Sequence, residues 1–305
     1  MRDDANLGVT DEASRSARPA FVSIFIILTV IAPIATVAAI WAPLIYTFNP
    51  IVQISVPKDF SGGNSWRTGP SQEKLALISP GTFLPRETSD QLVALARTML
   101  EGKFPVAGIS SRPLRLPFDK SAVFAGNSYW QLRYSGFSVP AVLIRAYREV
   151  PDERFLAAAR DFILGWEAFE RARWLPKGLV WNDHAIAARG VILAEFWHLY
   201  RRSALFEVAE AERIVELAAR TAALLANKRL YTYASNHGMV QNVGLLKLII
   251  LFPEFDAITR YRHMAVERTL AQLQYYLSEE GIVREHSIGY HAYGVWLVQG
   301  AVKFL

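Results

Sequence analysis

Two adjacent polar side chains in the second half of this 305-residue sequence can donate hydrogen bonds to a negative charge that develops during a reaction. Asn236 offers two amide N–H donors, and His237 can donate a hydrogen bond from a ring nitrogen. Each residue also has a purely structural interpretation. Asn236 occupies the position of a helix N-cap, and His237 can be a hydrogen-bonded core histidine.

Tyr290 is the third candidate, because a tyrosine hydroxyl can protonate a leaving oxygen. To act as a base, a tyrosine needs a cationic or hydrogen-bonding neighbour. Arg284, His286 and His291 are close enough in sequence to supply one. The structural alternative for Tyr290 is a packed aromatic ring whose hydroxyl is bonded to a carbonyl oxygen.

Several classes of chemistry lack support in this sequence. There is no cysteine, so thiolate metal sites, disulfides and cysteine nucleophiles are excluded. No two of the six histidines have the spacing of a helical HExxH zinc site, and no P-loop, dinucleotide fingerprint or GxSxG elbow is present. We therefore expect neither a metal nor a cofactor. The net charge of +5 comes from scattered residues, which argues against nucleic-acid binding and suits a polyanionic sugar or an ordinary solvated surface.

The elements that position these residues are predicted to be helices. Apolar residues recur at helical spacing from about residue 87, for example Phe155, Phe162 and Phe169 after a start at Pro151-Asp152. Further helices are expected at about 138–149, 183–201, 207–227, 238–251, 257–278 and 289–305. No strand-like alternation of useful length is seen. Short loops predict antiparallel helix pairs, and periodicity does not choose between a toroid and an open solenoid.

The N-terminal part has a different organisation. Phe21–Trp41 is an uncharged apolar run of about 20 residues, which matches the thickness of a bilayer. It is longer than the apolar core of a cleaved signal peptide, so we predict an uncleaved signal anchor. Arg15 and Arg18 place residues 1–20 in the cytoplasm and the domain after the anchor outside it, periplasmic or extracellular. Residues 42–84 read as a linker and irregular lead-in, and residues 85–305 as the helical domain.

Three segments, in order, resemble motifs of heparinase II/III-like and alginate lyase-like polysaccharide lyases. The first is Trp181-Asn182-Asp183-His184 followed by Arg189. The second is Asn236-His237-Gly238, followed by Gly244-Leu245-Leu246 and Phe252-Pro253-Glu254-Phe255. The third, Gly281 to His291, is similar to a signature of the form Asp-Gly-x3-Glu-x-Ser-x2-Tyr-His, with Glu280 in place of its aspartate.

This resemblance implies an all-α fold, an (α/α) toroid over residues 85–305, followed in the family by a β-sandwich. The sequence contains no segment for the sandwich and ends at Leu305 inside an apolar helical pattern, so a C-terminal continuation is expected.

The resemblance also implies β-elimination at a 4-linked uronate in an acidic polysaccharide. Asn236 and His237 would neutralise the uronate carboxylate, and Tyr290 would transfer the proton. The expected substrate-binding residues are Arg284, His291, Trp130, Tyr134, Trp181 and Arg189. Core packing is the alternative for the three aromatic residues, and an ion pair between helices is the alternative for Arg189.

Two other functions remain open. An inverting glycoside hydrolase on the same toroid would need two carboxylates about 6.5 to 9.5 Å apart, and Asp183 and Glu285 are the best pair available. A non-catalytic, membrane-anchored glycan-binding module would bind polyanionic sugars without turnover.

Overall fold

The computed structural model describes Thr36 and residues 88–106, 109–113, 115–173, 178–233, 235–284 and 287–305. Apart from Thr36, all of these belong to a unit that spans Thr47–Leu305. The predicted anchor Phe21–Trp41 and the lead-in 42–84 lie outside these ranges, except for Thr36. Within the ranges, no helix has both the length and the apolar character needed to span a bilayer.

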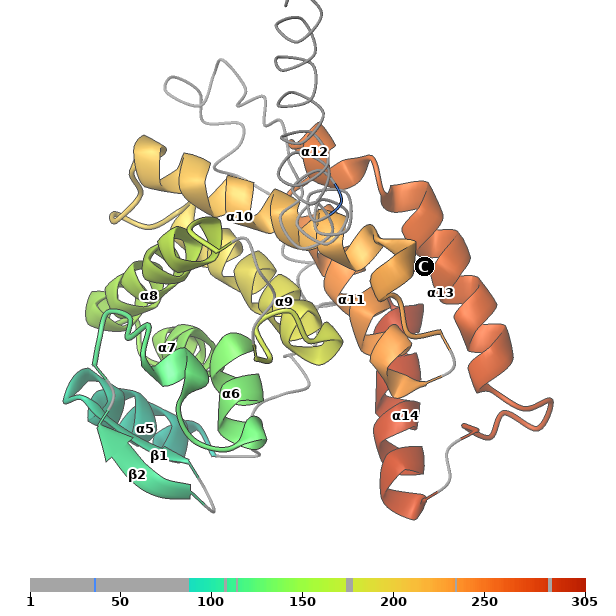
Figure 1. Ribbon diagram of the computed structural model, residues 1–305, viewed down its shortest axis with the longest axis horizontal. Helices are drawn as coiled ribbons and strands as arrows, with labels where there is room; N and C mark the ends of the chain where they lie inside the picture. The colour runs from blue at the N-terminus through green and yellow to red at the C-terminus, as the bar shows by residue number, and fades with distance from the viewer. Residues whose placement is uncertain are drawn as a thin grey trace, which may run out of the picture. The chain divides into compact units, whose positions relative to one another are not determined.

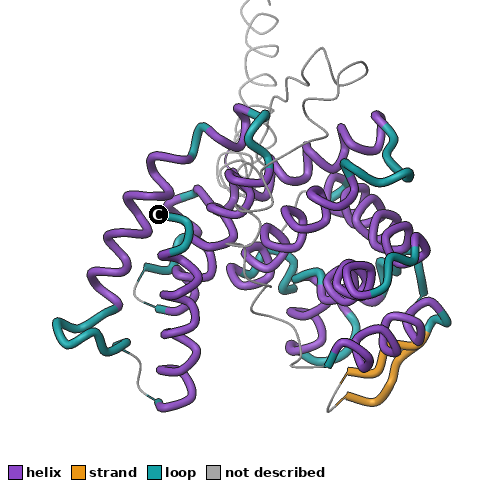
Figure 2. The backbone as a smooth tube through the Cα atoms, turned by 180° about the vertical axis from the view of Figure 1, so that it is seen from behind, coloured by secondary structure: helices purple, strands orange, loops and turns teal. Residues whose placement is uncertain are grey.

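The described part of the chain is mainly helical, as predicted (Figure 1). Its α-helices are α5 (Ser89–Leu100), α6 (Ser128–Ser135), α7 (Ser138–Glu149), α8 (Glu153–Arg171), α9 (Asp183–Tyr200), α10 (Val208–Ala226), α11 (Asn236–Leu251), α12 (Asp256–Thr259), α13 (Arg262–Tyr276) and α14 (Ile288–Val302). Two short 3-10 helices lie at Ala122–Phe124 and Lys228–Leu230. One antiparallel hairpin is formed by β1 (Lys103–Val106) and β2 (Ile109–Pro113), and it lies beside α5 (Figure 2).

Most predicted helices are confirmed to within two residues. The helix expected at 138–149 is α7, and Asp152 caps α8 by accepting a hydrogen bond from the backbone N–H of Arg154 at 3.0 Å. Two predictions are wrong. The single helix expected at 257–278 is broken into α12 and α13 around Arg260, and the expectation of no strands missed the β1–β2 hairpin.

Helices α9 and α11 pack against each other at the centre of the described unit (Figure 1). Almost every residue of both helices is buried, which explains why neither has a clear polar face. The two backbones come very close at Gly244, where a Cβ atom would lie 2.8 Å from the carbonyl oxygen of Ala187. Gly244 is part of the second resemblance segment, and this contact is a physical reason for a glycine there.

The other helices pack around this central pair. Helix α10 lies against α9, α13 and α14 lie against α11, and α7 packs on both α8 and α9. The loop between α7 and α8 is only three residues long, so these two helices form a hairpin. This series of helical hairpins is the toroid-like arrangement that the resemblance implied.

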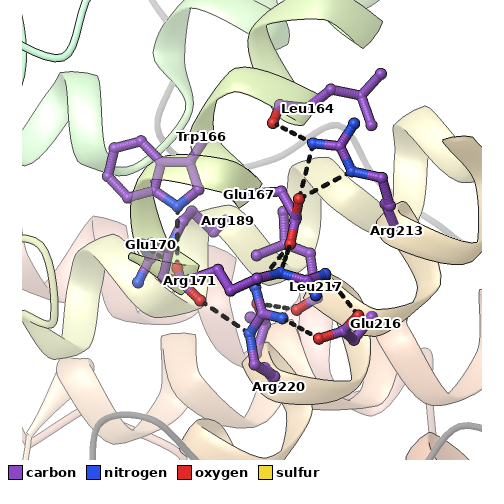
Figure 3. A network of polar contacts seen from close by, with 11 residues as sticks. Leu164, Trp166, Glu167, Glu170, Arg171, Arg189, Arg213, Glu216, Leu217 and Arg220 are labelled. Atoms are coloured by element: carbon purple, nitrogen blue, oxygen red, sulfur yellow. Dashed lines mark hydrogen bonds and ion pairs between the residues drawn. The ribbon is translucent and has the colours of Figure 1, made fainter. Parts of the chain in front are cut away.

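Buried carboxylates and arginines join α8, α9 and α10 (Figure 3). Glu170 of α8 accepts hydrogen bonds from the Trp166 indole at 2.9 Å and from the fully buried Arg189 guanidinium at 3.1 Å. Glu167, one turn earlier, pairs with Arg213 of α10 at 2.8 Å. These charges are paired across α8, α9 and α10, and α9 also carries part of the candidate site.

Candidate functional site

Asn236 is the first residue of α11, and Ser235 is the N-cap. The Ser235 hydroxyl accepts a hydrogen bond from the His237 backbone N–H at 3.2 Å. The structural alternative of an N-cap at Asn236 is therefore wrong. Asn236 is only 7% exposed as a residue, and its side chain makes no hydrogen bond to any described residue. Its amide atoms are not among the fully buried, unpaired side-chain atoms of the described residues, so the amide can be reached by a ligand.

The loop before α11 is held in place by a buried glutamine of α13. The Gln272 amide N–H donates to the carbonyl oxygens of Tyr233 and Ser235, each at 2.9 Å. Its carbonyl oxygen accepts from the Asn242 amide at 2.9 Å and from the Tyr231 hydroxyl. The packing leaves no room at Gly238, where a Cβ atom would lie 2.4 Å from a backbone oxygen. Asn236 and His237 therefore sit on a rigid turn.

His237 faces a carboxylate from the start of α9. Its Nδ1 atom lies 2.7 Å from Oδ2 of Asp183, and the Thr232 hydroxyl donates to the same oxygen at 2.8 Å. The other Asp183 oxygen accepts a hydrogen bond from the His184 backbone N–H at 2.9 Å. The first two resemblance segments therefore meet in space, although 54 residues separate Asp183 from His237.

The Asp183 carboxylate is ionised across the neutral pH range. Burial by itself would raise its pKa, but the hydrogen bonds from His237 and Thr232 and the positive charge of His237 outweigh burial and lower the pKa to about 2. Asp183 can therefore only accept hydrogen bonds from its neighbours near neutral pH.

His184 completes a pair of imidazole rings. Its ring meets the His237 ring edge to face, with 3.8 Å between the ring centroids. Burial, and to a smaller extent the charge of His237, lower the pKa of His184 from 6.5 to about 4, while Asp183 opposes the change. The His184 ring is consequently uncharged near neutral pH.

This depressed pKa predicts a pH-dependent stability. The folded state binds the His184 proton more weakly than the unfolded state, so stability present above pH 6.5 is lost as the pH falls towards 4. His184→Gln should flatten the decline of the unfolding free energy in this window, measured by denaturant titration at a series of pH values. His263→Gln, at an exposed position, is the matched control and should leave the decline unchanged. An identical decline in wild type and His184→Gln would contradict the prediction.

Both histidines line a pocket of about 460 Å³. Its other wall comes from α6, where Tyr129 and Arg133 are one helical turn apart. The remaining lining residues are Ser128, Leu132, Gly136, Ser138, Leu179, Asn182 and Ala188. Within the described ranges, no three histidine, aspartate or glutamate side chains are grouped to hold a metal ion.

Tyr290 is not among the residues that line this pocket. It lies in the first turn of α14 with 57% of its surface exposed, and its backbone N–H donates to the Ser287 hydroxyl at 3.2 Å. Arg284 is exposed in the preceding turn, and the His291 ring lies 3.3 Å from the Val283 carbonyl oxygen. Helix α14 does pack on α11, which carries Asn236. Glu285 and His286 lie outside the described residues.

Four residues expected to bind substrate are buried instead. Trp130 and Tyr134 are 3% and 1% exposed and stack on each other, and the Trp130 indole donates to the Ala122 carbonyl oxygen at 2.9 Å. Trp181 is also buried, and Arg189 is engaged with Glu170 and with the Val180 carbonyl oxygen at 2.8 Å. The prediction of sugar contacts is corrected for these positions, because their rings and charge are enclosed by the core.

The sequence interpretation missed Tyr129, Arg133, Asn182 and His184 as pocket residues. The aromatic residues chosen from the sequence were Trp130 and Tyr134, which are buried, whereas Tyr129 and Arg133, one position earlier in each case, line the pocket. The signal available in the sequence was the i, i+4 spacing of an aromatic residue and a cation. In the structure, the Arg133 guanidinium lies 5.8 Å from the Tyr129 ring centroid.

Comparison with known proteins found a matching family model and similar solved structures. The family model for the heparinase II/III N-terminus matches residues 120–304. Among solved structures, the heparan sulfate lyase HepC from Pedobacter heparinus is similar at 17% identity and a TM-score of 0.58, and the alignment covers 78% of this chain. A mutant of HepC gives 17% identity, a TM-score of 0.56 and 76% coverage of this chain.

These likenesses to HepC show the fold alone, because the identity is low. The chain spans only 38% of the length of HepC and 37% of that of the mutant. No curated protein gave a match. The family model, in contrast, covers more than half of the chain, including every described residue of the Asp183–His237 site. The chain therefore belongs to the heparinase II/III family, of which it carries the N-terminal domain.

Proposed function

We propose that this protein is a polysaccharide lyase that cleaves a 4-linked, uronic-acid-containing glycan by β-elimination. The observation that carries the proposal is the pairing of His237 with an ionised Asp183, beside the Asn236 amide, which bonds to none of the described residues. Both side chains extend from one rigid turn at the start of α11, and His237 lines the pocket.

The reaction breaks the C5–H bond next to the uronate carboxylate and the bond from C4 to the glycosidic oxygen. A double bond forms between C4 and C5, and the leaving oxygen takes up a proton. Charge builds up on the carboxylate as C5 loses its proton, so donors aimed at that carboxylate stabilise the transition state. We assign this role to Asn236 and His237. The exposed Tyr290 hydroxyl of α14 is assigned the transfer of the proton.

The proposed substrate is an acidic polysaccharide, the class to which the substrate of the similar heparan sulfate lyase belongs. Arg133 is the cation that α6 contributes to the pocket, and Tyr129 beside it offers a ring for a sugar to stack on. Arg284 and His291 remain proposed substrate contacts on the α14 side.

Arg133→Ala is expected to raise KM about tenfold with little change in kcat, because a charge-assisted hydrogen bond to a sugar acid group contributes about 1.5 kcal/mol or more. Steady-state kinetics on a uronate oligosaccharide measures both constants. Arg133→Lys keeps the charge and should recover part of the loss. A fall in kcat at unchanged KM would place Arg133 in the chemical step and contradict a binding role.

The proposed setting is the exported side of a membrane, with Phe21–Trp41 as the anchor and residues 85–305 as the enzymatic domain. This placement rests on the apolar run and its flanking arginines. Two fusions at Leu305 test this placement, one to a reporter that is active only outside the cytoplasm and one to a reporter that is active only inside it. Activity of the first reporter is expected, and activity of the second would overturn the placement.

An inverting hydrolase is the weaker alternative. A general acid for glycoside hydrolysis needs a raised pKa, whereas the pKa of Asp183 is lowered to about 2 and both of its oxygens accept hydrogen bonds. Asp183 is thus suited to hold His237 and unsuited to protonate a leaving group.

Ultraviolet absorbance of the unsaturated uronate product, recorded on a panel of uronate polysaccharides, tests the proposal. A rise that depends on the enzyme supports a lyase and identifies the glycan. New reducing ends without a rise in absorbance would replace the lyase by a hydrolase. Binding of a polysaccharide with neither product would replace it by a glycan-binding module.

A further inference from the structure

The geometry points to Asp183 as a positioning residue that, together with Thr232, fixes which nitrogen of His237 carries the proton and faces the pocket. This inference rests on the proposed function for its kinetic consequence, but its structural core concerns His237 alone. The family resemblance includes Asp183 in the Trp-Asn-Asp-His segment but implies no role for its side chain.

The first step is the direction of the hydrogen bond. An ionised carboxylate only accepts hydrogen bonds, so the 2.7 Å contact requires Nδ1 of His237 to be the donor. In the neutral ring, Nδ1 then carries the single proton and Nε2 holds a free lone pair. In the protonated ring, Nε2 is a donor and Asp183 balances the charge; the donor role proposed for His237 towards the uronate carboxylate requires this protonated form, because Nε2 of the neutral ring can only accept. Either way, Nε2 is the atom offered to a ligand in the pocket.

The second step is the rigidity of the carboxylate. Thr232 donates to the same Asp183 oxygen at 2.8 Å, and the backbone N–H of His184 donates to the other oxygen. The Thr232 backbone N–H is itself bonded to the Gln241 side chain of α11 at 3.0 Å. The carboxylate is thus held by groups from two segments and cannot turn away from the imidazole.

The third step concerns the other groups that face His237. His184 packs against its ring and is neutral above a pKa of about 4, so it adds no competing charge near neutral pH. Arg133 lines the same pocket from α6, and Asn182 lies at the N-cap of α9. Asp183 does not line the pocket itself, so we assign its effect on a substrate to its contact with His237.

Nitrogen NMR of the protein with labelled histidine tests the tautomer without any need for catalysis. His237 is assigned by the signal that disappears in His237→Gln. We expect neutral His237 to carry its proton on Nδ1 in wild type, and Asp183→Asn to shift the population towards a proton on Nε2. Unchanged nitrogen shifts in a folded Asp183→Asn variant would overturn the inference, whether or not the protein proves to be a lyase.

Kinetics supply the second arm. Asp183→Asn should lower kcat about 10- to 100-fold with little change in KM, the effect typical of removing a group that orients an active imidazole. Thr232→Val removes only the hydroxyl donor, should cause a smaller loss in the same direction, and keeps the test available if Asp183→Asn does not fold. Asp256→Asn makes the same chemical change at the exposed α12 and should leave kcat unaltered.

The two arms separate the possible failures. A tautomer shift in a protein without lyase activity would refute the proposed function and retain the role of Asp183. Normal kcat in both Asp183→Asn and Thr232→Val, in an active lyase, would refute the positioning role and retain the function.

Discussion

Asn236→Ala is expected to lower kcat for uronate cleavage about 100- to 1000-fold, the loss seen when one donor to a developing negative charge is removed. The reason is that Asn236 can supply amide N–H donors to the uronate carboxylate when C5 loses its proton. The unfolding midpoint should stay close to that of wild type, because the Asn236 side chain makes no hydrogen bond to any described residue and Ser235 caps the helix.

Asn236→Asp is the sharper variant, because it keeps the shape of the side chain and replaces donors by acceptors. It should be at least as inactive as Asn236→Ala, since a second carboxylate would repel the substrate. Retention of more than a tenth of wild-type kcat in Asn236→Asp would contradict the assignment. Loss of folded protein in both variants, seen by thermal unfolding, would instead make Asn236 a structural residue.

Glu170→Ala is expected to reduce the free energy of unfolding by about 3 to 5 kcal/mol, because it leaves a buried charge without its partner. Arg189 is fully buried and loses its 3.1 Å ion pair, and the Trp166 indole loses its acceptor (Figure 3). Denaturant unfolding of the purified variant measures the change.

Glu216→Ala is the matched control in the same network. Glu216 is 30% exposed and pairs with the half-exposed Arg171 at 2.7 Å and with the buried Arg220 at 2.6 Å. Its removal should cost less than that of Glu170, because solvent screens the Arg171 pair and Arg220 keeps its contacts with Glu167 at 3.7 Å and Glu170 at 3.5 Å. Equal losses in Glu170→Ala and Glu216→Ala would show that burial of the Arg189 charge does not dominate the stability of the network.

The helices were predictable where local sequence determines them. Helix α7 was predicted with its exact ends, and Asp152 marked the start of α8, because side-chain periodicity and capping are local properties. Helix α6 has eight residues and little apolar periodicity, so it was missed. The β1–β2 hairpin was also missed, since Pro105 and Pro113 interrupt the pattern that would indicate strands.

The candidate site was predictable only in part. The adjacency of Asn236 and His237 is a property of the sequence, but the contact between His237 and Asp183 depends on how α9 and α11 pack. Likewise, Tyr129 and Trp130 are adjacent in sequence, yet one lines the pocket and the other is buried. Helix orientation decides that difference, and orientation follows from the long-range packing of α6 on α9.

Mass spectrometry of the products that the protein releases from a uronate oligosaccharide with one cleavable linkage distinguishes elimination from hydrolysis. β-Elimination adds no water, so we expect two fragments whose masses sum to the mass of the substrate, with both fragments lost in Asn236→Ala. Fragments whose masses sum to the substrate plus one water would contradict the proposed lyase and identify a hydrolase.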